Sequence, residues 1–453
     1  MRNSYVESDK QYVLHPYTNL RTHQTVDPFI ITHGEGIYVW DDKGNKLIEG
    51  MSGLWCASLG FSEQRLTEAA TKQMQKLPYS HLFSHRSTEP AIELSEKMIS
   101  IAPDNMARVF LVNSGSEAVD MAIKMVWYYN NALERPRKKK IIARKRAYHG
   151  ITVAAGSLTG LPYVQDGFDL PAIPVMHTAT PHYYREGLPG ETEEDYATRL
   201  ASILEEEILA EDPDTIAAFI AEPIMGAGGV IIPPVGYFEK IQAVLRKYDI
   251  LLICDEVICG FARTGEMFGS TTFNAEPDLM TVAKQLSSAY LPIGGVMLTE
   301  AVYEVMEKGS DQHGMFGSGN TYGGHPVAAA VAVETLNIYE ERDIVNHVKG
   351  LSGHFQQGIE RLAGHPLVGQ GRSSGLIGAL EIVRNKETKV QYPVADKVAA
   401  QIANFARDHN LILRPTPGDS VALCPPLIIN EKELTLMFDR LEASLNDMQQ
   451  QLD

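Results

Sequence analysis

Two short apolar runs, each ending in charged residues, constrain the fold more than any other feature of this chain. The first run, Ile250–Cys254, is followed by Asp255 and Glu256. The second run, Asp278–Ala283, is followed by Lys284. Both are rich in branched residues and bounded by turn-forming residues, which is typical of strands buried on both faces. Because ligand crevices of open α/β sheets lie at the carboxyl ends of the strands, Asp255 and Lys284 are predicted to share one crevice.

Strand and helix patterns alternate on both sides of these runs. The other expected strands are Arg108–Val112, Lys140–Arg144, Ala172–Met176, Thr215–Ala221 and Gly294–Leu298. The expected helices are Ser62–Leu77, Glu89–Ile101, Glu117–Asn130, Glu193–Ala210 and Tyr237–Lys247. Such alternation predicts an α/β fold with a largely parallel, doubly wound sheet.

The two ends of the chain have a different character. A hairpin is expected over Gly36–Glu49, with its turn at residues 42–45. After Pro326 the expected helices are Val327–Tyr339, Ile344–Leu362, Val394–Asp408 and Glu431–Gln450, with strands near Gly375–Ile382 and Leu411–Leu423. We therefore predict a large domain over residues 61–325 and a smaller α+β domain built from residues 1–60 and 326–453, with the crevice between them.

Composition narrows the classes of function. The formal net charge of −17 argues against non-specific binding of nucleic acid, which depends on basic surfaces. One basic cluster, Arg135–Lys140 continuing to Arg144–Arg146, is interpreted as a solvated loop that leads into a buried strand. No apolar run reaches the length of a membrane span, and residues 1–10 do not resemble a signal peptide.

The cysteines do not suggest a metal site. Cys56, Cys254, Cys259 and Cys424 have no close metal-ligand spacing. Without a recognisable export signal they are expected to be buried thiols rather than disulfides. A cytoplasmic location is the corresponding expectation.

One motif could bind an anion. In Asn113–Glu117, the residues Ser114, Gly115 and Ser116 lie between an expected strand and an expected helix. Backbone N–H groups and serine hydroxyls at a helix N-terminus form an anion site, although a simple helix cap explains the same residues. The motif is neither a Walker loop nor a GxGxxG dinucleotide fingerprint.

Four further residues could complete a ligand site. Tyr148 follows an expected strand and could stack on a planar ring, or it could be a core tyrosine. Glu222 precedes three glycines, which permit close backbone approach or form an ordinary loop. Thr321 could donate its hydroxyl to a phosphate, although a bare turn explains that segment equally well. Arg414 could bind a carboxylate bidentately, or remain a surface arginine.

The pairing of Lys284 with Asp255 has a specific chemical use. A buried amine is a nucleophile toward carbonyl groups, and a carboxylate can keep a heteroaromatic nitrogen protonated. Pyridoxal phosphate requires both groups. The alternative is that Lys284 begins a solvated helix and that Asp255 is an N-cap.

The ordered set of motifs resembles the class III aminotransferases of pyridoxal-phosphate fold type I. It is most similar to their amine:pyruvate, or ω-transaminase, branch. The resemblance extends from about Val26 to the C-terminal helix, and its specificity comes from order: Asn-Ser-Gly-Ser-Glu, Tyr-His-Gly, Glu-Pro, Asp-Glu-Val, the lysine and Thr-Tyr-Gly-Gly-His-Pro. The implied fold is a large domain with a mainly parallel sheet and a small domain formed from both termini.

The resemblance implies how a cofactor is held. Lys284 would bind pyridoxal phosphate covalently, Asp255 would pair with its pyridine nitrogen, and Val257 would pack on the ring face opposite Tyr148. The phosphate would lie on Ser114, Gly115 and Ser116, and His149 and Glu222 would also border the cofactor. Thr321 would reach the phosphate bound in a neighbouring subunit, which implies an obligatory homodimer that could assemble further into a tetramer.

The resemblance also implies a substrate pocket, lined by Trp55, Phe83, Ser84, Tyr148 and Arg414. Arg414 matches a mobile arginine that admits either an apolar group or a carboxylate. Ser84 and Asn320 stand where relatives often have aromatic residues. Both departures could favour a longer or more polar amine.

The implied activity is transfer of an amino group from a primary amine to a keto acid in two half-reactions that share one site. The donor could be a monoamine, a diamine or an ω-amino acid, and pyruvate is the expected acceptor. The residues leave open 2-oxoglutarate as acceptor, and an aminomutase or decarboxylase reaction. A nucleotide-dependent dehydrogenase is disfavoured because its glycine fingerprint is missing, and an inactive scaffold is disfavoured because Lys284 is present.

Overall fold

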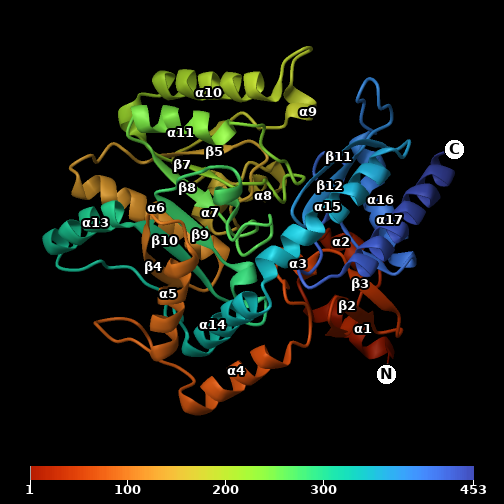
Figure 1. Cartoon of the computed structure of the whole chain (residues 1–453), viewed down its shortest axis with the longest axis horizontal. Helices are drawn as coiled ribbons and strands as arrows, with labels where there is room; N and C mark the ends of the chain where they lie inside the picture. Colours follow the sequence, from red (N-terminus) through yellow and green to blue (C-terminus); the bar gives the residue numbers. More distant parts are fainter. Residues whose placement is uncertain (1) are drawn as a thin grey trace.

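The computed structural model describes residues 2–453, and it is built around a seven-stranded sheet (Figure 1). Neighbouring strands follow the order β4 (Met106–Val112), β10 (Gly294–Thr299), β9 (Leu279–Val282), β8 (Leu251–Asp255), β7 (Ile216–Ala221), β5 (Lys140–Arg144) and β6 (Val175–Thr178). β10 runs antiparallel to both of its neighbours, β4 and β9, and the other neighbouring pairs in this sheet are parallel. The predicted mainly parallel α/β sheet is confirmed.

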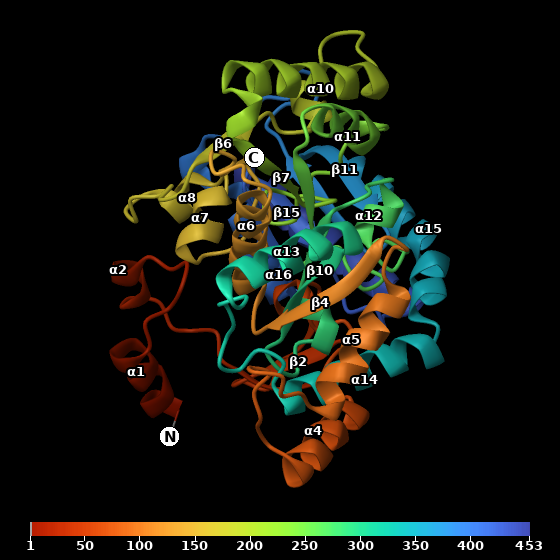
Figure 2. The ribbon, with the colours of Figure 1, turned by 90° about the vertical axis from the view of Figure 1, so that its left-hand side faces the viewer.

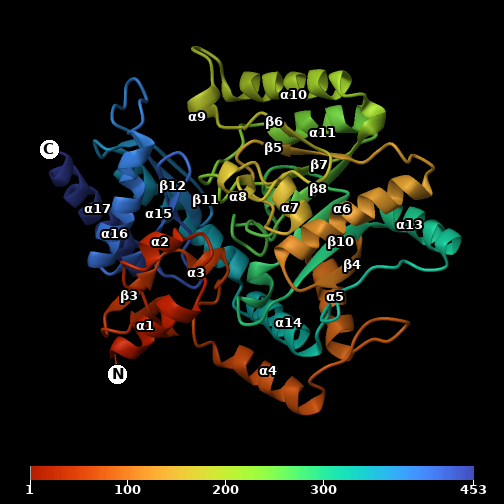
Figure 3. The ribbon, with the colours of Figure 1, turned by 180° about the vertical axis from the view of Figure 1, so that it is seen from behind.

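Helices cover both faces of this sheet, as Figures 1 and 3 show from opposite sides. One face packs on α6 (Gly115–Ala132), α7 (Val153–Leu158) and α13 (Glu300–His313). The other packs on α5 (Glu89–Ile101), α10 (Glu193–Ala210), α11 (Tyr237–Lys247) and α14 (Pro326–Glu341), and α4 (Gln64–Lys76) lies against α14. Successive residues of β5 point to opposite faces of the sheet. Ile141 lies in the core with α6, α7 and α13, and Ile142 lies in the core with α5, α10, α11 and α14. Strands buried on both faces explain the continuous apolar runs in the sequence.

Segments from the N-terminal and C-terminal parts of the chain share a smaller sheet. The hairpin of β2 (Tyr38–Asp41) and β3 (Lys46–Glu49) pairs with β1 (Ile31–Glu35) on one side. On the other side, β13 (Leu411–Ile412) runs parallel to β3, with Leu411 opposite Ile48. At the hairpin turn, Asp41 Oδ1 accepts hydrogen bonds from the N–H groups of Lys43 and Asn45 at 2.9 and 2.8 Å. The N-terminal hairpin therefore shares a sheet with the C-terminal part of the chain, while the domain limits at residues 60 and 325 stay predictions.

The C-terminal part contains a second four-stranded sheet. Its order is β11 (Val368–Ser374), β12 (Ile377–Ile382), β15 (Ser420–Leu423) and β14 (Arg414–Thr416). Helices α15 (Ile344–Ala363) and α16 (Val398–Asp408) contact this sheet, and α17 (Glu431–Leu452) packs on both helices. The predicted helix start at Val394 is wrong: residues 394–396 form a 3₁₀ turn, and Lys397 has a left-handed φ of 49° that separates this turn from α16.

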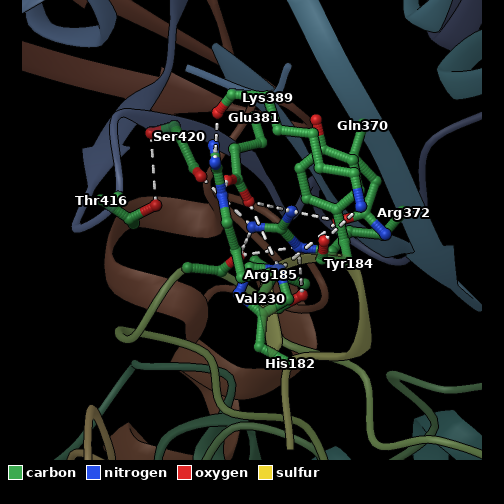
Figure 4. Close-up of polar contacts among 12 residues, drawn as sticks. His182, Tyr184, Arg185, Val230, Gln370, Arg372, Glu381, Lys389, Thr416 and Ser420 are labelled. Carbon is green, nitrogen blue, oxygen red and sulfur yellow. Dashed lines mark hydrogen bonds and ion pairs between the residues drawn. The ribbon is translucent and has the colours of Figure 1, made fainter. Parts of the chain in front are cut away.

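A buried charged network joins this sheet to loops of the large sheet (Figure 4). Glu381 on β12 is 1% exposed and accepts hydrogen bonds from Arg372 Nη1 at 2.8 Å and Arg185 Nε at 2.5 Å. Arg372 Nε also donates to the carbonyl oxygen of Val230 at 2.9 Å. His182 Nε2 lies 3.4 Å from Glu381. Removing one partner of a buried ion pair is costly, so this network fixes β11 and β12 against the short helix α9 (Tyr183–Glu186) and the loop at Val230.

His182 should make stability depend on pH. Burial and the Arg372 guanidinium lower the pKa of His182 to about 3. The unfolded chain protonates His182 near pH 6.5, whereas the folded chain does so only near pH 3. The free energy of unfolding is therefore at its full value above pH 6.5, and it decreases as the pH falls from 6.5 toward 3. At pH 5 the loss is about 2 kcal/mol.

We expect His182→Gln to remove this share of the acid sensitivity. The free energy of unfolding in urea, measured at pH 5 and pH 8, should differ by about 2 kcal/mol less in His182→Gln than in the wild type. His313→Gln, at an exposed position on α13, is the control and should follow the wild type. Equal pH dependence in all three proteins would contradict the assignment.

None of the helices within residues 2–453 is long and apolar enough to cross a membrane. All four cysteines are free thiols; Cys254, Cys259 and Cys424 are buried and Cys56 is partly buried.

Candidate active site

Asp255 and Lys284 come together at the carboxyl ends of two neighbouring strands. β8 and β9 are parallel, and Asp255 lies opposite Thr281, three residues before Lys284. Lys284 has a left-handed φ of 46°, which is unusual for a residue with a side chain. Such backbone strain is found mainly at functional sites, where the surrounding structure holds it in place.

The Asp255 carboxylate is buried and held by three donors. His149 Nδ1 lies 2.8 Å from Oδ2, while Thr281 Oγ1 and the Val257 N–H donate to Oδ1 at 3.1 and 3.2 Å. The side chain is therefore fixed in position where it lines the cavity. His149 Nε2 is buried without a hydrogen-bond partner among the described residues. An unpartnered buried nitrogen of this kind is a position where a bound group can form a hydrogen bond.

The surroundings of the Lys284 amine favour its reaction as a nucleophile and as a base. Burial lowers the pKa of Lys284 below its ordinary value, and the negative charge of Asp255 partly opposes this shift. A lowered pKa increases the fraction of the neutral amine, which is the form that attacks carbonyl carbon and accepts protons.

The N-terminus of α6 forms one end of the site. Ser114 is the N-cap, and its Oγ accepts a hydrogen bond from the Glu117 N–H at 3.2 Å. Gly115 packs so closely on Val257 that an added Cβ would lie 3.0 Å from its Cγ1. The hydroxyl of Ser116 accepts from the Ile151 N–H at 3.1 Å. Free N–H groups at the start of this 18-residue helix favour an anion such as phosphate.

These groups line one cavity of about 330 Å³, a size typical of small-molecule sites. Of the ten residues predicted to bind a cofactor, the cavity is lined by Ser114, Gly115, Ser116, Tyr148, His149, Glu222, Asp255, Val257 and Lys284. It is also lined by Cys56, for which the sequence carries no signal beyond its place next to Trp55.

Glu222 supports the wall of this cavity. Its two carboxylate oxygens accept hydrogen bonds from the N–H groups of Tyr148 and Gly226, each at 3.0 Å. Burial raises the pKa of Glu222 above its ordinary value. Its backbone carbonyl accepts from Arg144 Nη2 at 2.5 Å. The carboxylate thus connects the loop that carries Tyr148 to the glycine-rich loop that follows β7.

Arg414, at the start of β14, is not among the residues that line the cavity. Burial raises the pKa of Tyr148 and lowers that of Lys284, and the positive charge of Arg414 opposes the first shift and adds to the second. Tyr148 is also 3.2 Å from Tyr17, measured between hydroxyl oxygens. Sequence reasoning missed Tyr17, because nothing in its surroundings marks it as part of a site.

The other predicted substrate residues, Trp55, Phe83 and Ser84, are not among those that line this cavity. Trp55 is 2% exposed, has a φ of 64° and packs in an apolar cluster with Met51 and Ile258. Phe83 and Ser84 lie in the loop after α4, where Phe83 contacts Gly319. Their roles in binding substrate stay predictions.

Thr321 is likewise outside the cavity of its own chain. Its carbonyl oxygen accepts a hydrogen bond from the Tyr79 hydroxyl at 2.9 Å, and its side chain is exposed. Thr321 therefore lies beside the loop that carries Phe83, and the two loops form one surface.

The chain is similar to known aminotransferases along nearly its whole length. The sequence model of the family described as "Aminotransferase class-III" matches residues 20–445. γ-Aminobutyrate transaminase 1, mitochondrial, of Oryza sativa subsp. indica is 50% identical over 437 residues, which cover 95% of this chain and 84% of that protein. γ-Aminobutyrate transaminase 3, chloroplastic, of Solanum lycopersicum is 46% identical over 442 residues, covering 97% of this chain and 85% of that protein.

Solved structures show the same fold. The ω-transaminase from Pseudomonas jessenii in complex with PMP is 54% identical, with a TM-score of 0.96 and coverage of 98% of each chain. A thermostable four-fold mutant of the enzyme from the same organism is 53% identical, with a TM-score of 0.97 and coverage of 99% of each chain.

The residues of the cavity fit the cofactor of this family, pyridoxal phosphate. The N-terminus of α6 can take the phosphate, buried Asp255 can take a protonated ring nitrogen, and the Lys284 amine can take the aldehyde. The cavity of about 330 Å³ provides space for the cofactor, and the unpartnered His149 Nε2 can form a hydrogen bond to a group bound beside Asp255. By sequence, fold and site, the chain belongs to the class III aminotransferases, which use pyridoxal phosphate.

Proposed function

We propose that this aminotransferase moves an amino group from a primary amine to pyruvate, in two half-reactions that share the cavity at Lys284. The observation that carries the proposal is the Lys284–Asp255 pair lining one cavity, together with Arg414, whose positive charge acts on the Lys284 amine. An arginine there can bind the carboxylate of a keto acid, while the apolar part of the site receives the amine. The similarity to solved ω-transaminase structures supports amino-group transfer, and pyruvate as the acceptor is part of the proposal.

The residues have distinct tasks in this scheme. Bound pyridoxal phosphate supplies an electron sink for the carbon atom that carries the amine. Lys284 Nζ accepts the proton from that carbon as a general base, and in the opposite half-reaction donates a proton to the carbonyl carbon of the keto acid. Asp255, held by His149 and Thr281, keeps a proton on the pyridine nitrogen. The N-terminus of α6 holds the phosphate.

The named relatives favour an ω-amino acid among the donors. The plant proteins at 46–50% identity are named γ-aminobutyrate transaminases. γ-Aminobutyrate carries both an amine and a carboxylate, so Arg414 can bind its carboxylate end in one half-reaction and that of pyruvate in the other. This predicts overlapping use of Arg414 by donor and acceptor. A purely apolar donor would not need this arginine.

We further propose that the active enzyme is a cytoplasmic homodimer, with Thr321 reaching the phosphate bound by the other chain. Tyr79, Phe83 and Tyr322 are exposed aromatic residues near Thr321, and a second copy of the chain would cover them. Sedimentation tests this: the holoenzyme should run at twice the 50.0 kDa chain mass or a multiple of it, and a stable active monomer would refute it.

The reaction is tested by mixing the holoenzyme with an amine alone. The visible absorption of the bound cofactor should disappear, and pyruvate should restore it while alanine is formed. Comparing monoamines, diamines and ω-amino acids, each with pyruvate or 2-oxoglutarate, identifies the preferred pair. Release of carbon dioxide without an acceptor would show a decarboxylase, and nitrogen retained within one substrate an aminomutase.

We expect Arg414→Ala to raise the KM for pyruvate by about 10- to 100-fold, because a charged hydrogen bond contributes about 1.5–3 kcal/mol. The rate with an uncharged amine should change only a few-fold in the first half-reaction. Stopped-flow measurement of each half-reaction separates the two effects. Arg407→Ala, at an exposed arginine on α16, is the control. A similar loss for pyruvate and for an amine without a carboxylate would contradict the role of Arg414.

A further inference from the structure

The N-terminal segment brings together three side chains that could bind a metal ion. Asp9 lies on α1 (Arg2–Tyr12), His15 in the following loop, and His23 at the end of α2 (Leu20–His23). Among the described residues, theirs is the group whose candidate ligand atoms all lie within 4.8 Å of one another. Figure 2 shows α1 and α2 at the edge of the molecule, away from the large sheet.

The distances are close to those of a metal site. His15 Nε2 lies 2.9 Å and His23 Nε2 3.1 Å from the same oxygen, Asp9 Oδ1. In a tetrahedral zinc site with bonds of about 2.0–2.1 Å, ligand atoms are about 3.3–3.4 Å apart. Each imidazole nitrogen therefore lies within about half an ångström of the distance from the carboxylate oxygen that such a site requires, and all three ligand atoms lie within 4.8 Å of one another.

The three side chains are partly buried, and their surroundings allow them to bind an ion. Their side-chain exposures are 21% for Asp9, 30% for His15 and 10% for His23, and the two imidazole rings lie 4.3 Å apart. The neighbouring cation, Lys10, is paired with Asp27 at 2.9 Å, so its charge is compensated. Neither imidazole Nδ1 has a hydrogen bond to the described residues, so each can carry the ring proton while Nε2 binds the ion.

A carboxylate that accepts hydrogen bonds from two imidazoles would explain the cluster without a metal. The ligand set nevertheless matches a metal site in kind, because two imidazoles and one carboxylate are the protein ligands of many zinc sites that leave a fourth position for water. We propose that Asp9, His15 and His23 bind a divalent transition-metal ion, with Zn²⁺ the preferred ion.

Such an ion would fasten a segment that contacts the active site. His15 and Tyr17 line a second cavity of about 1230 Å³, and Tyr17 contacts the hydroxyl of Tyr148 in the first cavity. All three proposed ligands lie between residues 9 and 23, so the ion would close a short loop around Tyr17. Metal binding is therefore expected to stabilise this segment, in which Tyr17 contacts Tyr148 of the first cavity.

The site is tested with tag-free holoenzyme that has been treated with a chelator. Titration with Co²⁺ should give one equivalent per chain with visible bands typical of four-coordinate cobalt, and Zn²⁺ should displace it. His15→Ala/His23→Ala should lose this binding. Asp9→Asn, which keeps a hydrogen-bond acceptor but loses the charge, should weaken it by at least about tenfold. The matched control, His33→Ala/His313→Ala, removes two exposed histidines and should bind as the wild type does.

Retained cofactor absorption and circular dichroism show that each variant is folded. Binding that is absent in the wild type, or that persists in His15→Ala/His23→Ala, would refute the metal site and leave hydrogen bonds as the whole explanation. Zn²⁺ should also slow tryptic cleavage after Lys10 and Arg21 in the wild type and not in the double variant. Equal cleavage with and without Zn²⁺ would refute the fastening of the segment.

Discussion

Lys284→Ala is expected to reduce the rate of transamination by at least about 10⁴-fold, the largest loss of any single change. Lys284 is the amine at the end of β9, with its pKa lowered by burial. Alanine removes both the covalent attachment of the cofactor and the base that moves the substrate proton. None of the other cavity-lining side chains is a lysine, so no second amine is placed to replace it.

The rate is measured as alanine formed from pyruvate and an amine at saturating pyridoxal phosphate. Lys247→Ala, at an exposed lysine on α11, is the control and should retain wild-type activity. Reduction of the wild-type holoenzyme with borohydride should tag the peptide that contains Lys284. A tag on another peptide, or activity of Lys284→Ala near the wild-type rate, would contradict the assignment.

The sequence predicted best those elements whose limits are set locally. The limits of β5, α10 and α11 agree with the prediction to the residue. For α10 the reason is visible: Thr192 and Asp195 form a capping box, and the helix begins directly after it. Local capping and apolar runs are present in the sequence itself, so they can be recognised without the fold.

Features that depend on distant parts of the chain were not predictable. β10 has the same apolar pattern as a parallel strand, and its antiparallel direction follows only from its pairing with β4 and β9. β6 was expected from Ala172 but begins after Pro174, which cannot donate to the sheet. The network around Glu381 joins residues almost 200 positions apart.

The residues of the candidate site also fall into two groups: those that the sequence predicts and those that it does not. Asp255, Lys284 and the Ser114 loop follow strands, so the topology of the sheet alone brings them to one edge. Tyr17 contacts Tyr148 and Cys56 lines the cavity, but no local sequence pattern predicts either position. Thr321 and Phe83 lie outside the cavity of their own chain, and their predicted roles depend on a second copy.

Asp255→Asn is expected to lower kcat by about 10²- to 10⁴-fold, second only to the loss of Lys284. Asparagine has nearly the same shape, and its amide oxygen can still accept from Thr281 and Val257, while its amide nitrogen can donate to His149 in the other tautomer. The change thus removes a buried negative charge with little change in packing. Without that charge the pyridine nitrogen is less readily protonated.

The size of the effect distinguishes a chemical role from a structural one. If Asp255 serves only to hold His149 and Val257, Asn should preserve these contacts, and kcat should stay within tenfold of the wild type. If its charge is needed, proton removal should slow in single-turnover experiments while the melting temperature changes little. Thr281→Val supplies the complementary control: it removes one hydrogen bond to Asp255 but keeps the charge, so its loss of kcat should be much smaller than that of Asp255→Asn.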